Sequence, residues 1–393
     1  MKILVIAPTP FFSDRGTHIR ILEEALALEK RGHAITIATY HIGADLPKTL
    51  DTKIDIRRIR RLLFWYKKLE AGPGWQKIIL DLLLIKKVLF LARTQKPDVM
   101  HAHLHEGVAI GWIVQKLLFW RDMKLVGDFH GSLTKEMVSH DYLGAGVQKK
   151  VFQWIEARID NMGDIAVTSS WENTQEISAL RKSRTTETLL DGVNTDWYRS
   201  LPSQSEARKH FDLPLDKVIV TYTGALIPNK GIKYFLESIP LALEKNPDIH
   251  FVIAGFPFDL IRPFFEGRNL ESSVTFILKS PFPYFDLPKL LRASDIGVDP
   301  KDVSVRQASG KLLQYMGAGL PVACFDTQNN REFLGEGHIL ADKLSAQGLS
   351  DVILRLAEDA DLRKRLGKEN QERSAKFSWG RSAEQLETLI RNA

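Results

Sequence analysis

The chain has 393 residues and a mass of 44.6 kDa, and 44% of its residues are hydrophobic and 26% charged, values that exclude a disordered or fibrous protein. Its single cysteine, Cys324, excludes a disulfide framework and a thiolate metal cluster. Residues 1–200 hold 29 basic and 23 acidic residues, whereas residues 201–393 hold 25 of each, so the net charge of +6 is local and argues against a nucleic-acid-binding coat.

The start of the chain carries no pattern of a secretory signal. Residues 3–7 form an apolar segment directly after Met1 and Lys2, and this segment is too short for the core of a signal peptide. The most apolar stretch, residues 78–91, is interrupted by three charged side chains and falls short of the roughly 20 apolar residues of a transmembrane helix. We therefore expect a cytoplasmic protein.

In chain order, short apolar runs alternate with helical patterns. Residues 2–7 are predicted to form a buried strand, residues 17–31 an amphipathic helix that ends at Gly32, and residues 34–40 the next strand. Further strands are predicted at residues 98–102, 124–129, 164–168 and 187–190. This β-α-β order predicts a mostly parallel sheet covered by helices.

The same order begins again after about residue 200. Strands are predicted at residues 217–223, 250–254, 274–278, 295–299 and 321–325, and helices at residues 230–245, 287–293, 311–318 and 379–391. The polar stretch 191–205 is predicted to link two domains. We therefore expect an α/β protein of two Rossmann-like, doubly wound domains that face a cleft, with ligands at the carboxyl ends of the strands.

Two loops after predicted strands have features of phosphate-binding loops. In residues 8–16, Gly16 opens a helix and lets a ligand approach the backbone. In residues 223–231, Lys230 stands beside a helix N-terminus, which disfavours a cation unless an anion such as a diphosphate offsets it. The alternative for each is an ordinary turn with a solvated lysine.

Residues 305–322 are the most specific segment. Ala308, Ser309 and Gly310 are small and open a predicted helix, so their amide groups can face a phosphate. Gln314 follows one turn later and can reach a sugar hydroxyl, while Gly319 suits the end of the helix. The alternative is a well-capped helix between two strands.

Together these segments resemble a family 4 glycosyltransferase of GT-B architecture, in order and over nearly the whole chain. The resemblance rests on Arg15-Gly16, residues 30–33, residues 97–103, Phe129-His130-Gly131, residues 191–196, residues 224–231, Ala254-Gly255, residues 293–295 and residues 311–321. It implies a retaining, metal-independent transfer of a sugar from a nucleotide diphosphate sugar, UDP- or GDP-linked, to a hydroxyl acceptor, with no cofactor. It also implies an acceptor-side domain at residues 1–198, a nucleotide-sugar domain at residues 199–376, and a helix at residues 377–393 that packs back on the first domain.

The resemblance assigns roles to particular residues. His130 would lie beside the transferred sugar, and Lys230 would bind the diphosphate and help the nucleotide leave; these are the expected catalytic residues. The donor-binding set is Gly16, Gly224, Lys230, Gly255, Arg306, Ala308, Ser309, Gly310, Lys311 and Gln314. The acceptor-side set is Arg15, Thr17, His103 and His105.

The chain departs from the family pattern at three positions. The family usually has two glutamates eight residues apart where this chain has Arg306 and Gln314, and an arginine where it has Ala225. A glutamine still bonds ribose hydroxyls but loses a charge-assisted hydrogen bond. The alternatives are therefore a GT-B-type nucleotide-sugar epimerase and a catalytically silent subunit that binds a sugar nucleotide or glycan.

Residues 101–106 contain three alternating histidines. Alternating side chains on a strand share one face, so His101, His103 and His105 are geometrically able to bind a metal. No second ligand cluster supports such a site, and we expect no metal. Four acids near predicted loop ends are candidates for a base at the acceptor hydroxyl, and the sequence does not choose among them: Asp14, Asp128, Glu136 and Asp141.

Residues 57–68 form a basic patch without an acid. Its members are Arg57, Arg58, Arg60, Arg61, Lys67 and Lys68, beside the aromatic Trp65. Cations beside aromatic side chains suit an anionic membrane surface, at about 1 kcal/mol for each cation near it. The hypothesis is a peripheral enzyme at the inner face of the membrane that makes a glycolipid or lipid-linked glycan. The alternative is a strand end and a packed helix with solvated arginines.

Overall fold

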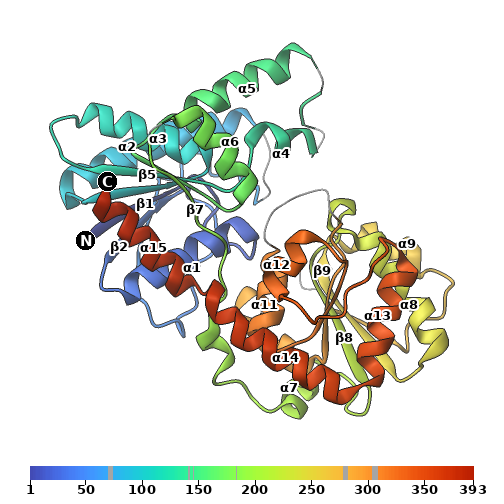
Figure 1. The fold of residues 1–393 in the computed structure, drawn as a ribbon. Coiled ribbons are helices and arrows are strands. Elements are labelled where there is room, and N and C mark those ends of the chain that lie inside the picture. The colour runs from blue at the N-terminus through green and yellow to red at the C-terminus, as the bar shows by residue number, and fades with distance from the viewer. Residues whose placement is uncertain (70–73, 140–141, 145, 183, 278–281, 303–308) are drawn as a thin grey trace. The chain divides into compact units, whose positions relative to one another are not determined.

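The structure is a computed structural model that describes residues 1–69, 74–139, 142–144, 146–182, 184–277, 282–302 and 309–393 (Figure 1). The chain divides into two compact units, which are described separately below. Unit 1 comprises Met1–Asp191 and Trp379–Ala393, and unit 2 comprises Gly192–Ser378. Residues 192–198, placed in the first domain by the sequence analysis, thus fall in unit 2, and the returning C-terminal segment begins at Trp379 rather than at residue 377.

Unit 1 contains a sheet of seven parallel strands in the order β3-β2-β1-β4-β5-β6-β7. The strands are β1 (Lys2–Ala7), β2 (Ala34–Thr39), β3 (Asp55–Arg58), β4 (Val99–His103), β5 (Lys124–Phe129), β6 (Ile165–Thr168) and β7 (Thr186–Thr188). The central strands are buried on both faces, which accounts for their continuous apolar runs. The sequence analysis missed β3, since this edge strand is short and polar.

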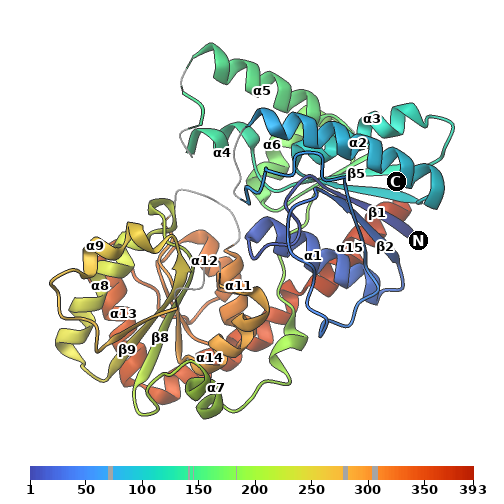
Figure 2. The ribbon, with the colours of Figure 1, turned by 180° about the vertical axis from the view of Figure 1, so that it is seen from behind.

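Helices cover both faces of this sheet. They are α1 (Gly16–Lys30), α2 (Trp75–Gln95), α3 (Leu104–Leu117), α4 (Leu133–Ser139), α5 (Val147–Asp160), α6 (Trp171–Arg181) and α15 (Trp379–Asn392). The core includes Leu80, Leu84 and Val88 of α2, packed with side chains of the sheet. The C-terminal α15 lies beside α1 on the other face (Figures 1 and 2), where Glu387 Oε2 accepts a hydrogen bond of 2.6 Å from Arg31 Nε. The expected return of the C-terminal helix to the first domain is confirmed.

Unit 2 contains a sheet of five parallel strands in the order β10-β9-β8-β11-β12. The strands are β8 (Val218–Ala225), β9 (Ile249–Phe256), β10 (Val274–Ile277), β11 (Ile296–Asp299) and β12 (Val322–Cys324). The α-helices are α7 (Gln204–His210), α8 (Ile232–Lys245), α9 (Arg262–Phe265), α10 (Leu287–Ala293), α11 (Gly310–Gly317), α12 (Gln328–Leu334), α13 (Ala346–Glu358) and α14 (Ala360–Ser374). Both units are Rossmann-like, as the sequence analysis expected.

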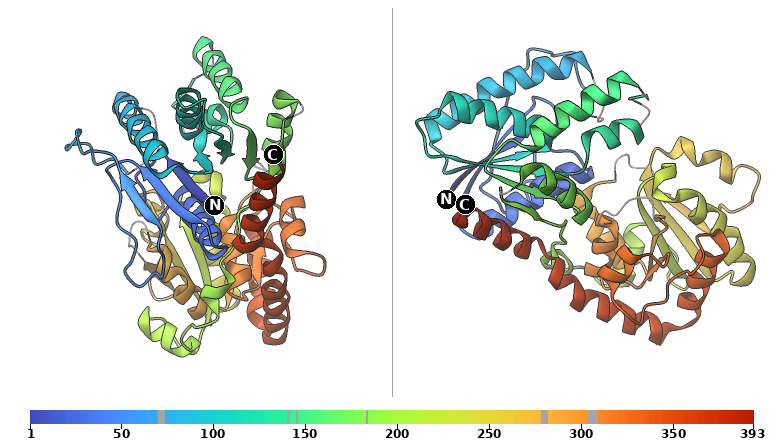
Figure 3. Two further views of the ribbon diagram at one scale, coloured as in Figure 1. Left: turned by 90° about the vertical axis from the view of Figure 1, so that its left-hand side faces the viewer. Right: turned by 45° about the horizontal axis from the view of Figure 1, so that its top comes forward.

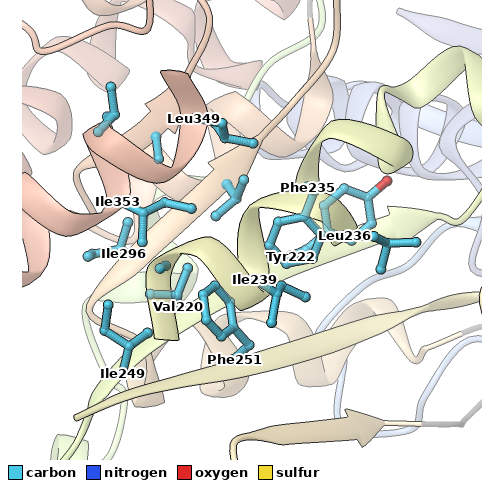
Figure 4. Packing of buried hydrophobic residues seen from close by; sticks show 14 of the residues in the cluster. Val220, Tyr222, Phe235, Leu236, Ile239, Ile249, Phe251, Ile296, Leu349 and Ile353 are labelled. Atoms are coloured by element: carbon cyan, nitrogen blue, oxygen red, sulfur yellow. The ribbon is translucent and has the colours of Figure 1, made fainter. Parts of the chain in front are cut away.

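The core of unit 2 lies between its sheet and helix α8. The buried positions of α8 include Ile232, Phe235, Leu236 and Ile239, a spacing that places one apolar stripe on the strands. Phe235 stacks on Tyr222 of β8 at a centroid distance of 5.3 Å (Figure 4). This packing fixes the carboxyl end of β8, where the candidate donor loop begins.

None of the helices in the described part of the chain is both long enough and apolar enough to span a membrane.

Candidate functional site

Two glycines hold the loops at the carboxyl edge of the unit 2 sheet close together. A Cβ added at Gly255 would lie 2.2 Å from the Gly224 carbonyl oxygen, so a larger residue would separate the ends of β8 and β9. Gly231 has φ +71°, and a Cβ there would lie 1.8 Å from the Pro300 carbonyl oxygen. The loop that carries Lys230 is thereby seated against the end of β11.

Three lysines and two aspartates lie near one another at this edge. Asp299 ends β11, and its Oδ1 lies 3.6 Å from Nζ of Lys311, near the start of α11. Lys311 Nζ also lies 4.1 Å from the centre of the Tyr222 ring, a cation–π geometry. Lys230 and Lys301 complete the group, since Lys230, Asp299 and Lys311 all act electrostatically on Lys301. We call Lys230, Lys301 and Lys311 the lysine cluster.

The titration of Lys301 shows how crowded the positive charges are. Burial, together with the cations Lys230 and Lys311, lowers the pKa of Lys301 to about 8 against the opposing effect of Asp299 and Asp302. Three ammonium groups thus stand against two carboxylates. Both Asp299 oxygens and Lys311 Nζ are buried without a hydrogen bond in the structure. An anionic group with several acceptor oxygens fits this arrangement.

The beginning of α11 has features of an anion site. Among the described residues, a Cβ added at Gly310 would meet no atom within 4 Å, and the Ser309 side chain does not cap the helix. The helix N-terminus therefore presents amide groups and positive dipole in the same region as Lys311. Gln314 is buried one turn later, where its Oε1 accepts a 2.6 Å hydrogen bond from the Tyr198 hydroxyl. Arg306 and Ala308 lie outside the described residues.

The sequence analysis did not single out Asp299, Lys301 or Tyr222. The signal for the first two was the short Asp299-Pro300-Lys301 segment directly after a predicted strand, at the end where ligands bind. Tyr222 has no comparable signal, because a strand tyrosine is ordinarily a core residue. Lys311 was expected in the donor site. Its side chain adds a positive charge to that of the helix start, and both favour an anionic ligand.

Unit 1 carries a buried ionic network at the carboxyl ends of β4 and β5. Arg20 of α1 donates two hydrogen bonds to Asp128, at 2.9 and 3.1 Å, and one of 2.8 Å to Asp191. Burial raises the pKa of Asp128, but the Arg20 charge, together with His130 and the hydrogen bonds of His103 and His130, outweighs it and holds this pKa well below its ordinary value. Asp128 is thus a buried, ionised anchor and is unsuited to the role of proton acceptor named among four candidates above.

Two histidines that the sequence analysis named as site residues, His103 and His130, contact Asp128. His103 Nδ1 is 3.0 Å from Asp128 Oδ2, and His130 Nε2 is 3.5 Å from the same oxygen. The two rings also contact each other, with 3.2 Å between His103 Nδ1 and His130 Nε2. Burial lowers the pKa of His103 to about 4, so His103 is neutral at neutral pH. The His130 side chain keeps 12% of its surface exposed, so Asp128 and His103 orient a ring that remains accessible.

His105 does not belong to this group, contrary to the expectation of three histidines on one strand face. Strand β4 ends at His103, and His105 lies in the first turn of α3. Its Nε2 lies 3.2 Å from Asp160 Oδ1 and 3.8 Å from Glu156 Oε1, both on α5. His105 thus does not share a strand face with His101 and His103, and its expected place on the acceptor side stays a prediction.

Two groups of side chains in the described part of the chain have the spacing of metal ligands. The first is Glu24, His101, His103 and Asp128, and the second is His105, Glu156 and Asp160. Arg20 donates a hydrogen bond to Asp128 and lies 2.9 Å from Glu24 Oε1. The guanidinium group therefore already balances the negative charges of the first group. In the second group, His105 supplies the positive charge, because Asp160 and Glu156 raise its pKa although burial opposes them.

The loop before α1 is open at its glycine. A Cβ added at Gly16 would meet no atom within 4 Å, while Arg15 and Thr17 on either side are half-buried. His18 holds this loop, because its Nδ1 accepts a 3.1 Å hydrogen bond from the Ser13 amide and contacts the Ser13 hydroxyl. Burial lowers the pKa of His18 to about 4, which keeps Nδ1 available as an acceptor. The sequence analysis missed His18.

In the basic patch at residues 57–68, some side chains pair with other groups of the protein and others are exposed to solvent. Arg58 donates hydrogen bonds to the carbonyl groups of Phe11, Ile42 and Ala44 and therefore braces the Gly16 loop. Arg57 forms an exposed ion pair with Asp55. The remaining members, Arg60, Arg61, Trp65, Lys67 and Lys68, are exposed.

Two Rossmann-like units, each with a glycine-containing loop at the carboxyl edge of its parallel sheet, are typical of GT-B glycosyltransferases. Comparison with known proteins supports this class. The family described as "Glycosyl transferases group 1" matches residues 203–373, and "Glycosyltransferase Family 4" matches residues 15–197. The chain belongs to the family 4 glycosyltransferases of GT-B architecture.

Individual relatives are distant. D-inositol 3-phosphate glycosyltransferase of Corynebacterium glutamicum is 23% identical, over 96% of this chain and 92% of its own. The solved structure of HepE from Anabaena, in complex with UDP and glucose, has a TM-score of 0.74 at 17% identity and covers 100% of both chains. WaaG, a glycosyltransferase involved in lipopolysaccharide biosynthesis, has a TM-score of 0.67 at 15% identity and likewise covers 100% of both chains.

Proposed function

We propose that this glycosyltransferase moves a sugar from a UDP- or GDP-sugar to a hydroxyl acceptor, and that its unit 2 holds the diphosphate of the donor. The lysine cluster around Asp299 is the observation that carries the proposal. Three ammonium groups against the carboxylates of Asp299 and Asp302 leave an excess of one positive charge, which favours an anionic diphosphate. The UDP bound by HepE, a protein of the same fold, supports a nucleotide diphosphate as the ligand.

Within this site, the Lys311 ammonium group borders the carboxyl end of β8, because a Cβ on Gly224 would lie 3.9 Å from Lys311 Nζ. Lys230 and Lys311 then stabilise the negative charge that develops on the departing nucleotide. Because side chains and a helix N-terminus supply this charge, the proposed reaction needs no metal ion, and the family resemblance implies retention of configuration.

In unit 1, Gly16 and His130 belong to the proposed sugar-binding side, with His130 oriented by Asp128 and His103. The acceptor that we propose is a glycolipid or a lipid-linked glycan precursor, reached at the inner face of the membrane. The exposed bases and Trp65 of residues 57–68 support this, and so does the similarity to WaaG, which is described as involved in lipopolysaccharide biosynthesis.

A panel of nucleotide sugars tests the donor part of the proposal. The protein is incubated with each sugar, with and without lipid-linked acceptors, and release of the nucleotide is followed. Lys230→Ala is expected to lower turnover by about 10²-fold or more at unchanged thermal stability. The matched control is Lys233→Ala, since Lys233 lies close by on α8 with an exposed side chain and is expected to leave turnover unchanged.

Three results would contradict the proposal. Sugar transfer by Lys230→Ala at the unaltered rate would remove Lys230 from the site. Conversion of the sugar nucleotide to an epimer without acceptor would indicate an epimerase. Binding of nucleotide sugars without release or transfer, across the whole panel, would indicate a silent binding subunit.

A further inference from the structure

Helix α5 buries acidic side chains and exposes apolar ones, the reverse of an ordinary surface helix. Its two buried residues are the acids Glu156 and Asp160, which face His105. Its apolar side chains Val147, Val151 and Trp154 are exposed, Val147 at 78% and Trp154 at 60%. A helix with water as its only neighbour places charge outside and apolar groups inside. The exposed face of α5 is therefore built for a neighbour other than water.

Helix α2 shows an apolar stripe that also faces outward. Trp75, Ile78 and Leu82 are exposed at spacings of three and four residues, which places them in one row along the helix. Phe90 continues the exposed face near the other end. The opposite side of α2 carries Leu80, Leu84 and Val88, which already fill the core.

Helix α3 lies between the other two and joins their outer faces. It packs against both α2 and α5, and the three helices lie side by side in the right-hand view of Figure 3. At its C-terminal end, Ile113 and Leu117 are exposed, and the following turn exposes Phe119 at 79% together with Trp120. We call the outward sides of α2, α3 and α5, with this turn, the outer helical face.

Such exposure is concentrated in unit 1. Of the 22 large hydrophobic side chains recorded as exposed among the described residues, 19 belong to unit 1. Unit 2 contributes Leu215, Leu260 and Leu344, without an aromatic residue. Apolar patches of this extent mark interaction surfaces.

On the three helices, the acids are buried or paired, whereas the exposed charged side chains are basic. All four acids on them are occupied or buried: Tyr40 donates its hydroxyl to Asp81, Lys77 pairs with Glu106 at 2.7 Å, and Glu156 and Asp160 are turned inward. The exposed bases are Lys86, Arg93, Lys116, Lys150 and Arg158. Arg158 also lies over the Trp154 ring at 5.0 Å, an arrangement that holds an arginine beside an aromatic anchor.

We infer that the outer helical face of unit 1 docks on an anionic lipid bilayer. Aromatic and aliphatic side chains would enter the boundary between headgroups and acyl chains, and the bases at their margins would meet anionic headgroups. Among the described residues of α2, α3 and α5 the exposed charges are all basic, which favours an anionic surface over a partner of mixed charge; the acid Asp122 is exposed just beyond the turn that follows α3. The inference deepens the proposed function, because it rests on a lipid-linked acceptor and assigns the surface that approaches it.

Flotation with vesicles tests the inference on the full-length protein. Vesicles of phosphatidylcholine alone are compared with vesicles that also contain phosphatidylglycerol, at low and high salt. The protein is expected to float with the anionic vesicles and less so at high salt. The double variants Val151→Ser/Trp154→Ser and Lys86→Glu/Lys150→Glu are each expected to lower binding by roughly tenfold or more. The matched control, Leu215→Ser/Leu260→Ser in unit 2, is expected to bind normally.

Circular dichroism of each variant confirms folding, and light scattering without vesicles gives the molecular mass. Equal binding to neutral and anionic vesicles, or a dimer that does not float, would overturn the inference. Nucleotide-sugar binding, measured by calorimetry without vesicles, separates it from the proposed function. If vesicle binding fails while nucleotide-sugar binding persists, only the docking surface is wrong; if vesicle binding persists while the unaltered protein binds no nucleotide sugar, only the proposed function is wrong.

Discussion

Lys311 Nζ lies 3.6 Å from Asp299 Oδ1 and 4.1 Å from the centre of the Tyr222 ring, so an acid and an aromatic face together hold one cation at the carboxyl edge of the unit 2 sheet. Both partners are rigid, because Asp299 ends a buried strand and Tyr222 is stacked on Phe235. When an anion binds, a lysine side chain that is already held in place loses less conformational entropy than a lysine that is free in solvent. This arrangement underlies the first two predictions.

Lys311→Met is expected to weaken UDP or GDP binding by about 10- to 150-fold, which corresponds to the loss of a charge-assisted hydrogen bond of about 1.5–3 kcal/mol. Lys311→Arg should restore part of this affinity. Because Lys311→Met alone leaves Asp299 without its cation, stability should fall as well, and Lys311→Met/Asp299→Asn should recover stability but not binding. Calorimetric titration and thermal unfolding measure both quantities. Full nucleotide affinity in the double variant would show that the Lys311 charge is not used.

Lys301 should make nucleotide binding dependent on pH. Its pKa of about 8 means that its charge is lost as the pH rises above 8, so diphosphate affinity should decrease there. Lys301→Arg should remain charged and bind without this decrease. The effect on folding has the opposite sign: between about pH 8 and pH 10.4 the unfolded chain binds more protons at this residue, so its contribution to stability rises with pH. An unchanged pH profile in Lys301→Arg would contradict the assignment.

Arg20→Met should destabilise unit 1 by about 3–5 kcal/mol, because the buried carboxylates of Asp128 and Glu24 lose their cation. The matched control is Arg199→Met, which breaks an exposed ion pair with Asp196 and should cost less than about 1 kcal/mol. Urea unfolding of the two variants measures the difference. Equal costs would mean that the network around Arg20 is not a stabilising anchor.

His105 should make stability decrease as the pH rises through neutrality. Burial opposes its charge, but Asp160 and Glu156 raise its pKa above the ordinary value, so its stabilising effect is complete below about pH 6.5 and is lost as the pH passes the folded pKa. The pKa of Asp160 is also raised by burial, which acts in the same direction. His105→Gln should flatten this slope of thermal stability against pH, and a slope equal to that of the unaltered protein would contradict the pairing.

The sequence by itself determined the class of fold and most of its elements. Apolar runs such as residues 2–7 and 124–129 predict buried parallel strands because both faces of those strands are covered, and their bounds are the ones observed. Strand β3 was not predictable in this way, since its residues are mostly polar and only pairing with β2 makes it a strand. His105 was assigned to a strand because alternation does not reveal where a strand ends.

Tertiary structure alone decided which charges act together and which surfaces stay uncovered. Lys230 was visible as a loop lysine, but its grouping with Lys301, Lys311 and Asp299 depends on β8 and β11 being neighbours in the sheet. The outer helical face was equally hidden, because an apolar residue on a helix is ordinarily read as core. Only burial distinguishes Leu84, which is in the core, from Leu82, which is exposed on the same helix. Sequence period reports the regular structure of a segment, whereas the side of a helix that meets the sheet is set by contacts between residues far apart in the chain.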